Sequence, residues 1–87
     1  MQHFSYRPLG VCSQMIDFDI DNGKIMNVEF LGGCSGNLQG IGRLVQGMPV
    51  EEVINRLEGI KCGFKQTSCP DQLCYAIRKA QEEMKQN

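Results

Sequence analysis

The chain lacks any long hydrophobic run, and this absence argues against two classes of protein. The first seven residues hold no apolar stretch of the length that a signal peptide requires. No later segment offers the roughly 20 consecutive apolar residues of a membrane-spanning helix. We therefore expect a cytoplasmic protein with no membrane segment, in a compartment that keeps thiols reduced.

An excess of charge of one sign is also missing. Nine lysines and arginines face ten aspartates and glutamates, which leaves a formal net charge of −1. Domains that bind nucleic acids usually carry a basic stripe or patch, and the sequence shows neither this nor an acidic tail. The composition therefore predicts no nucleic-acid partner.

Residues suited to catalysis are scarce as well. His3 is the only histidine, and it lies out of phase with Phe4 and Tyr6, so we expect it to face solvent. The glycine loop Gly32–Asn37 has neither the lysine of a P-loop nor the glycine spacing of a dinucleotide fingerprint. An enzyme that acts alone is therefore not predicted.

Cysteine, by contrast, is abundant, with five in 87 residues. Four of these lie where predicted elements meet, namely Cys12, Cys34, Cys62 and Cys69. Cysteines kept for packing tend to lie inside a strand or on the core stripe of a helix. In a reducing compartment, such residues bind metal or do redox chemistry more often than they form structural disulfides. No pair of these cysteines has the C-x-x-C spacing of a zinc motif. The prediction of a metal site therefore depends on where the four lie, at the ends of elements. For each of them the alternative is a purely structural role without a ligand.

Cys69 has a specific chemical case as a ligand. It stands in Thr67–Asp71 at the start of a predicted helix, where unpaired N–H groups and the helix dipole favour the thiolate. In the alternative interpretation, Ser68 caps the helix and Cys69 merely fills space. Cys74 lies about 140° further round the helix, at about 100° per residue, on the flank of the core stripe. We expect Cys74 to pack.

Alternating hydrophobicity predicts an antiparallel sheet of three strands. A short first strand is expected at Phe4–Tyr6, followed by strands at Met15–Ile20 and Lys24–Phe30. The pair Asn22–Gly23 between the last two is typical of a two-residue hairpin turn with positive φ. On one face of the third strand we expect Met26, Val28 and Phe30.

After the third strand the hydrophobic period becomes helical. The first helix should end before Gly47–Pro49, and Gly42 beside its apolar stripe should allow a neighbouring element to approach closely. The second helix should span Val50–Leu57 and end before Gly59. A last helix should begin at Ser68 or Cys69. The expected core stripes are Leu38, Ile41 and Val45 on the first helix and Leu73, Ala76, Ile77, Ala80 and Met84 on the last. Strands followed by helices predict one α+β domain over residues 1–87, with the helices on one face of the sheet.

Two segments carry a resemblance to a known family. Thr67–Leu73, preceded by the loop Gly32–Asn37, resembles the TSCPD domain, and the resemblance extends from about Tyr6 to Ala80. That domain occurs as small four-cysteine proteins and at the end of cobalamin-dependent ribonucleotide reductases. The resemblance implies that its four cysteines are Cys12, Cys34, Cys62 and Cys69 here.

A more distant resemblance is to the IscU-type iron–sulfur scaffold, which implies an IscU-like fold. The scaffold's three cysteines match, in order, Cys12, Cys34 and Cys69. The chain departs from the scaffold at Gln14, where an aspartate is expected, and at Ser68, where a histidine is expected. The resemblance therefore implies the fold rather than the assembly activity. The additional thiol of Cys62 would close the site, and closed four-thiolate sites are structural or store electrons.

Three functions are compatible with these features. The first is a small cytosolic module whose four junction cysteines hold one zinc ion or one iron–sulfur cluster, because four-sulfur tetrahedral sites suit both. The second, implied by the reductase resemblance, is a redox accessory to ribonucleotide reduction in which two cysteines cycle between dithiol and disulfide. The third is a metal-free interaction domain whose cysteines only pack. A reductase, or a donor of metal or sulfur, is the expected protein partner.

Overall fold

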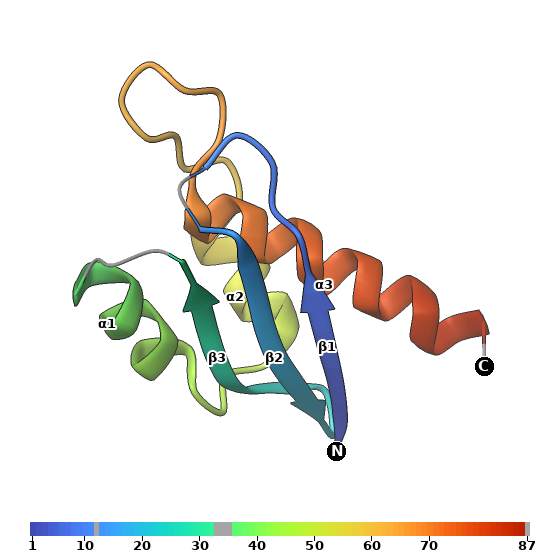
Figure 1. The fold of residues 1–87 in the computed structure, drawn as a ribbon. Helices are drawn as coiled ribbons and strands as arrows, with labels where there is room; N and C mark the ends of the chain where they lie inside the picture. Colours follow the sequence, from blue (N-terminus) through green and yellow to red (C-terminus); the bar gives the residue numbers. More distant parts are fainter. Residues whose placement is uncertain (12, 33–35, 87) are drawn as a thin grey trace.

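The computed structural model describes residues 1–11, 13–32 and 36–86. Within these ranges the chain forms three antiparallel strands followed by three helices, which confirms the predicted α+β class. The strands are β1 (Gln2–Tyr6), β2 (Met15–Asp21) and β3 (Lys24–Leu31), and the helices are α1 (Gly36–Val45), α2 (Val50–Leu57) and α3 (Cys69–Gln86). Strand β2 lies at the centre of the sheet, between β1 and β3 (Figure 1).

The turn between β2 and β3 is the one that the sequence predicts. Asn22 and Gly23 have φ values of 51° and 75°, and positive φ at both central residues is the requirement of a type I′ turn. This turn matches the twist of the two strands and sets their pairing, in which Asp21 faces Lys24.

A β-bulge interrupts the pairing farther along β3. Asp17 pairs with Glu29 but Asp19 pairs with Met26, so β3 has one residue more than β2 between the two pairs. Asn27, in the extra space, has a φ of 54°. Asparagine tolerates this left-handed conformation better than most residues, and it allows the strand to accommodate the additional residue.

The bulge changes which β3 side chains face the helices. Ile25 is fully buried in the core, and Val28 and Phe30 pack against the core beyond the bulge. Met26 instead pairs with Asp19 and does not belong to the core. The prediction that Met26 shares a face with Val28 and Phe30 is therefore wrong, because the alternation does not run unbroken through β3.

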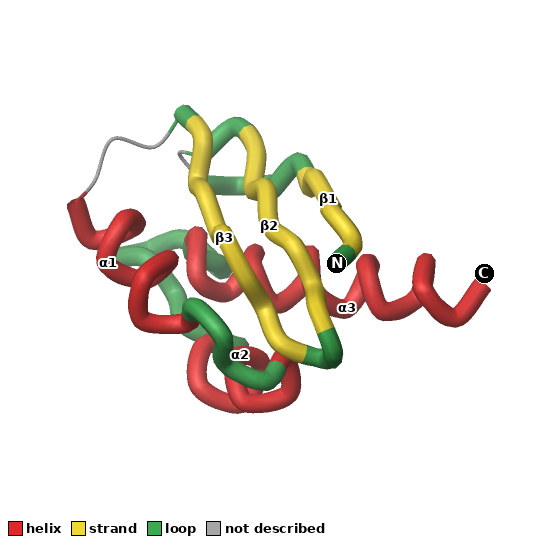
Figure 2. Tube along the Cα trace, turned by 90° about the horizontal axis from the view of Figure 1, so that it is seen from below, coloured by secondary structure: helices red, strands yellow, loops and turns green. Residues whose placement is uncertain are grey.

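The helices cover one face of the sheet, as predicted. Helices α2 and α3 lie on the same side of the sheet, and α1 lies alongside β3 (Figures 1 and 2). The core between these layers includes the β2 side chains Ile16, Phe18 and Ile20 and the α2 side chains Val50, Val53 and Ile54. None of the described helices is long and apolar enough to cross a membrane.

Helix α1 approaches β3 closely at Gly42. A Cβ atom at this position would lie 2.8 Å from the carbonyl oxygen of Val28, which is too short for an ordinary contact. The predicted close approach at Gly42 is confirmed. Leu38 and Val45 on the same helix are buried, as expected from their spacing.

Helix α3 is longer than the sheet that it covers. Its predicted core residues Leu73, Ala76, Ile77 and Ala80 are all buried, but Met84 is 40% exposed. The 18 residues of α3 span about 27 Å at 1.5 Å per residue, whereas the five residues of β1 span about 17 Å. The last turns of α3 extend beyond the sheet (Figure 1), so the expectation that Met84 lies in the core is wrong.

Candidate functional site

The start of α3 is fixed by the side chain of Ser68. The backbone N–H of Asp71 donates to Ser68 Oγ at 3.2 Å, and the Ser68 hydroxyl donates to the Ile60 carbonyl oxygen at 2.6 Å. Ser68 is therefore the N-cap, as in the alternative interpretation of the sequence. Pro70 follows in the first turn, where its missing N–H removes no helical hydrogen bond.

Asp71 links the start of α3 to the end of α2. Its carboxylate accepts hydrogen bonds from the Gly59 N–H at 2.7 Å and from the Thr67 hydroxyl at 2.6 Å. The residue is only 4% exposed, so both bonds form largely out of contact with water. Both carboxylate oxygens of Asp71 therefore accept hydrogen bonds that hold the fold together.

Gln72 links the same helix end to the segment after β1. Its Oε1 accepts from the Leu9 N–H at 3.1 Å, and its Nε2 donates to Thr67 Oγ1 at 3.0 Å. The polar side chains around the start of α3 thus hold two neighbouring loops. The thiol of Cys69 takes no part in these particular bonds.

Cys69 and Cys62 are the two predicted ligands that lie within the described residues. Cys69 is 7% exposed, and its Sγ lies 3.2 Å from the Oγ of Ser13, just before β2. Cys62 is exposed, and its backbone N–H donates to the Thr67 carbonyl oxygen at 3.2 Å. The segment that carries Cys62 therefore lies directly beside the segment that precedes Cys69.

Cys12 and Cys34, the other two predicted ligands, lie outside the described residues. A described neighbour of the first is close to the start of α3, because Ser13 contacts Cys69.

The segment that precedes Cys34 lies beside the start of β2. The Gln14 N–H donates to the Leu31 carbonyl oxygen at 2.7 Å, and a Cβ atom on Gly32 would lie 2.8 Å from Gln14 Cγ. The start of β2, the end of β3 and the start of α3 thus share one end of the sheet (Figure 1).

The positions of Cys62 and Cys69 do not establish a metal centre. The part of the chain that the structure describes contains no group of three or more His, Cys, Asp or Glu residues arranged to hold a metal ion. Two of the four predicted ligands fall outside that part. The ligand set Cys12, Cys34, Cys62 and Cys69 therefore stays a prediction.

Cys74 packs inside the molecule, as predicted. It is 1% exposed, and its Sγ lies 3.9 Å from the Val53 carbonyl oxygen. Burial raises the pKa of the Cys74 thiol to about 12, with a further contribution from the negative charges of Glu58 and Asp71. Cys74 is therefore neutral at physiological pH and unsuited to metal binding or to nucleophilic chemistry.

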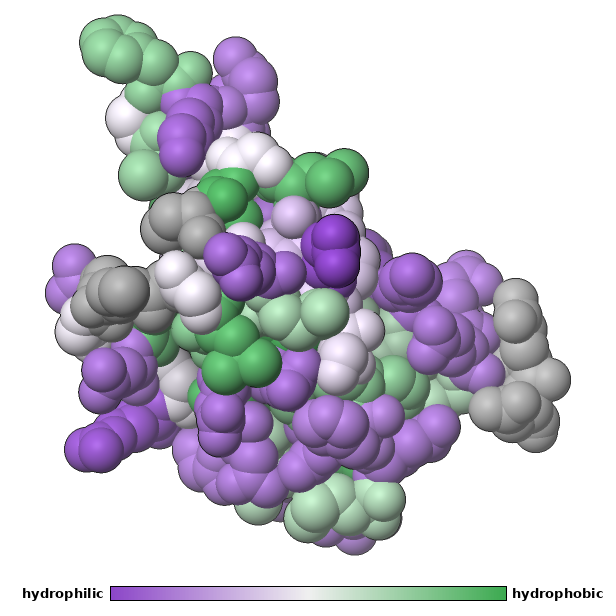
Figure 3. Space-filling model, in the orientation of Figure 1, coloured by the Kyte–Doolittle hydropathy of each residue, from purple (hydrophilic) through white to green (hydrophobic). Residues whose placement is uncertain are grey.

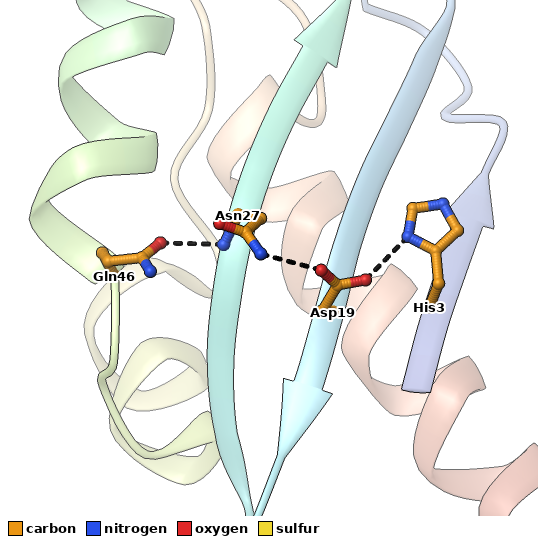
Figure 4. A network of polar contacts seen from close by, with 4 residues as sticks. All are labelled: His3, Asp19, Asn27 and Gln46. Atoms are coloured by element: carbon orange, nitrogen blue, oxygen red, sulfur yellow. Dashed lines mark hydrogen bonds and ion pairs between the residues drawn. The ribbon is translucent and has the colours of Figure 1, made fainter. Parts of the chain in front are cut away.

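The open face of the sheet carries a polar network (Figure 4). Asp19 accepts from the Asn27 side-chain amide at 2.8 Å and lies 2.8 Å from His3 Nδ1. Gln46, just after α1, accepts from the Asn27 N–H at 2.8 Å. The bonds from Asn27 and His3 hold the pKa of Asp19 below its ordinary value.

His3 is exposed to solvent, as predicted, but the sequence did not indicate the other members of the network. Asn27 joins it because the bulge turns its backbone N–H toward Gln46. The residues of the network tie the three strands to the end of α1, which is a structural rather than a catalytic arrangement.

Comparison with known families identifies the chain. The family model of the TSCPD domain matches residues 2–81. The chain belongs to the TSCPD domain family. Neither the curated proteins nor the solved structures include a match to it, and the resemblance to IscU-type scaffolds is not confirmed. In this TSCPD domain, the five residues that give the family its name, Thr67–Asp71, build the start of α3 and hold the adjoining loop.

Proposed function

We propose that this TSCPD domain is a small metal-binding module of the cytoplasm. Its four junction cysteines would hold one zinc ion or one iron–sulfur cluster at the end of the sheet where α3 begins, namely Cys12, Cys34, Cys62 and Cys69. The observation that carries the proposal is that described neighbours of all four cysteines lie at that end. Four thiolates suit zinc and iron–sulfur clusters equally, because both prefer soft ligands in tetrahedral arrangement.

The hydrogen bonds around Cys69 support this proposal. Ser68, Asp71 and Gln72 fix the helix start and the loops beside it, so the local backbone is held without help from the thiols. A ligand on such a fixed backbone loses little freedom when it binds a metal. A bound metal would in turn tie the loop around Cys62 to the helix, and binding would add to the free energy of folding.

A second candidate function is thiol redox chemistry in support of a reductase. It is favoured by the exposed thiol of Cys62, in a segment hydrogen-bonded next to Cys69. The two thiols would form one S–S bond while a disulfide on the partner protein is reduced to two thiols, with both protons transferred to the partner. This reaction needs the thiols free of metal, which separates it from the first candidate.

The metal content of serine variants tests the first candidate. We expect Cys12→Ser, Cys34→Ser, Cys62→Ser and Cys69→Ser each to lower the metal bound per chain, in protein purified without oxygen. Cys74→Ser is the matched control, because its buried thiol already packs against α2. Full metal retention in Cys69→Ser, or equal loss in Cys74→Ser, would contradict the assigned ligand set.

A chelator distinguishes the two candidates further. If the metal contributes to folding, the chelator should lower the melting temperature of the native protein and have no further effect on Cys69→Ser. Native protein that holds no metal, yet forms a Cys62–Cys69 disulfide when mixed with a small disulfide oxidant, would support the redox candidate instead.

A further inference from the structure

The loop between α2 and α3 ends in a built turn that presents one phenylalanine to solvent. The Lys65 N–H donates to the Cys62 carbonyl oxygen at 3.0 Å, which closes a four-residue turn. Gly63 has a φ of 58°, whereas Phe64 is not among the residues with positive φ. This combination is the pattern of a type II′ turn, with glycine at its first central position. Phe64 therefore occupies the tip, where its relative exposure is 106%.

Two further apolar side chains are exposed at this end of the molecule. Ile60 is 42% exposed and Leu9 is 71% exposed. Leu9 is fixed beside the loop because its N–H donates to Gln72, whose side chain in turn bonds Thr67. The projecting loop carries hydrophobic residues at its tip next to hydrophilic ones (Figure 3). Exposed apolar side chains that lie close together among polar residues mark contact surfaces, whereas single scattered ones are ordinary.

The exposed charges around these side chains are cationic. Arg7, Lys61 and Lys65 are exposed and form no ion pair within the described residues. The nearby carboxylates already have partners within the chain. Asp71 is buried and hydrogen-bonded, and Glu58 pairs with Arg78 at 2.7 Å.

We infer that this end of the molecule, defined by Phe64, Ile60, Leu9, Lys61, Lys65 and Arg7, is the docking surface for a partner protein. The partner would present an apolar pocket for the Phe64 ring and a rim of aspartates and glutamates for the cations. A single aromatic residue inserted into a pocket is a common energetic centre of protein interfaces. Complementary charges at the rim raise the association rate and select the partner.

The form of the turn favours a protein over a membrane as the occupant. The hydrogen bond that closes the turn restricts the backbone that carries the ring, and this restriction reduces the ordering cost of binding a shaped pocket. A membrane offers no pocket, and even a myristoyl chain gives only marginal membrane binding by itself. One phenylalanine with two smaller flanking side chains is a weaker anchor than that, and the three cations beside it are fewer than the about four to eight that lipid-binding basic clusters carry. The turn is closed by a backbone hydrogen bond, and none of the six side chains is a predicted metal ligand, so the inference does not rest on the proposed metal site.

Site-specific photo-cross-linking in the cells that naturally encode the chain tests this inference. The photoreactive residue p-benzoylphenylalanine replaces Phe64 in one variant and Leu44 in the control, because Leu44 on α1 is also an exposed apolar residue, at 78%. We expect the variant at position 64 to form an adduct with one protein that is absent from the control, identified by mass spectrometry. The cross-linked peptide of that protein should lie beside aspartates or glutamates.

The identified protein is then purified and its affinity for the full chain is measured by titration calorimetry. Phe64→Ser should weaken binding by about tenfold or more, the effect of losing an interface anchor of about 1.4 kcal/mol. The double variant Lys61→Glu with Lys65→Glu should slow association and reduce its salt dependence. Leu44→Ser should leave the affinity unchanged. The Phe64 ring has no protein around it, so Phe64→Ser should also keep the native melting temperature.

Several results would overturn the inference. One is that position 64 gives no adduct above the position-44 control; another is that the purified partner binds Phe64→Ser as tightly as the native chain. Phe64-dependent sedimentation with vesicles of phosphatidylcholine and phosphatidylserine would assign the loop to membranes. A Phe64-dependent dimer in sedimentation velocity would assign it to a second copy of the chain.

Discussion

Replacement of Asp71 by alanine should cost this TSCPD domain a large part of its stability, whatever the metal content. The substitution removes both hydrogen bonds that the carboxylate accepts, from the Gly59 N–H and the Thr67 hydroxyl. A hydrogen bond to a charged group contributes about 1.5–3 kcal/mol, so the lower limit for the pair is about 3 kcal/mol. In a domain of this size, that loss lowers the melting temperature by about 12 °C or more, at about 4–8 °C per kcal/mol.

The measurement is urea unfolding followed by circular dichroism, on chelator-treated protein so that metal loss does not contribute. Asp71→Asn retains one acceptor for the Gly59 N–H and should lose about half as much stability. Asp21→Ala serves as the control, since this carboxylate is half-exposed and its ion pair is a 3.8 Å contact with the amino terminus; its effect should stay within about 0.5 kcal/mol. A loss below about 1 kcal/mol in Asp71→Ala would refute the structural role that we assign to the aspartate of the motif.

Three further substitutions test separate parts of the fold. Gly42→Ala should destabilise the domain by about 1–3 kcal/mol in urea unfolding, because the new methyl group collides with the Val28 carbonyl oxygen; an unchanged midpoint would show that α1 can move away freely. The native chain should lose stability at low pH as Asp19 becomes protonated, and Asp19→Asn should not show this loss. The bond from Asn27 lowers the Asp19 pKa below 3.8, so its contribution is complete above that pH and disappears as the pH falls through the lowered pKa. Equal pH profiles for the native chain and the variant would contradict this. Cys74→Ser should cost only about 1 kcal/mol by the same method and leave the metal content unchanged, and metal loss would disprove its packing role.

The sheet was predictable wherever local chemistry decides the backbone. The Asn22–Gly23 pair fixes a type I′ turn by itself, and the alternation of Ile16, Phe18 and Ile20 gives the buried face of β2. The bulge in β3 was not predictable in the same way. Met26, Val28 and Phe30 keep perfect spacing in the sequence. Ile25 enters the core opposite Ile20, and the bulge at Asn27 then brings Val28 and Phe30 to the same face.

The helices were also predictable only in part. The spacing of apolar residues predicts the buried stripe of α3 up to Ala80, because periodicity reports which face is apolar. It does not report where the partner sheet ends, and Met84 lies past that end. The length of β1 relative to α3 contains this information, but only once the strands have been placed beside the helix.

The candidate site was predictable in its general location only. The positions of Cys62 and Cys69 at element ends follow from the turn and helix signals around them. The contact between Ser13 and Cys69 joins residues far apart in the sequence, and it follows from the pairing of β2 in the sheet rather than from any local pattern. The role of the motif polar groups in holding loops was likewise invisible in the sequence, because Ile60 and Gly59 contribute only backbone atoms.

Metal analysis of the native chain tests the central proposal most directly. The protein is purified without oxygen, its zinc, iron and acid-labile sulfide are measured per chain, and its visible spectrum is recorded. The proposal predicts either about one zinc ion per chain with a colourless solution, or iron and sulfide in similar amounts with a charge-transfer band. Protein that contains neither metal, and whose four junction cysteines all react promptly with a thiol reagent, would contradict it.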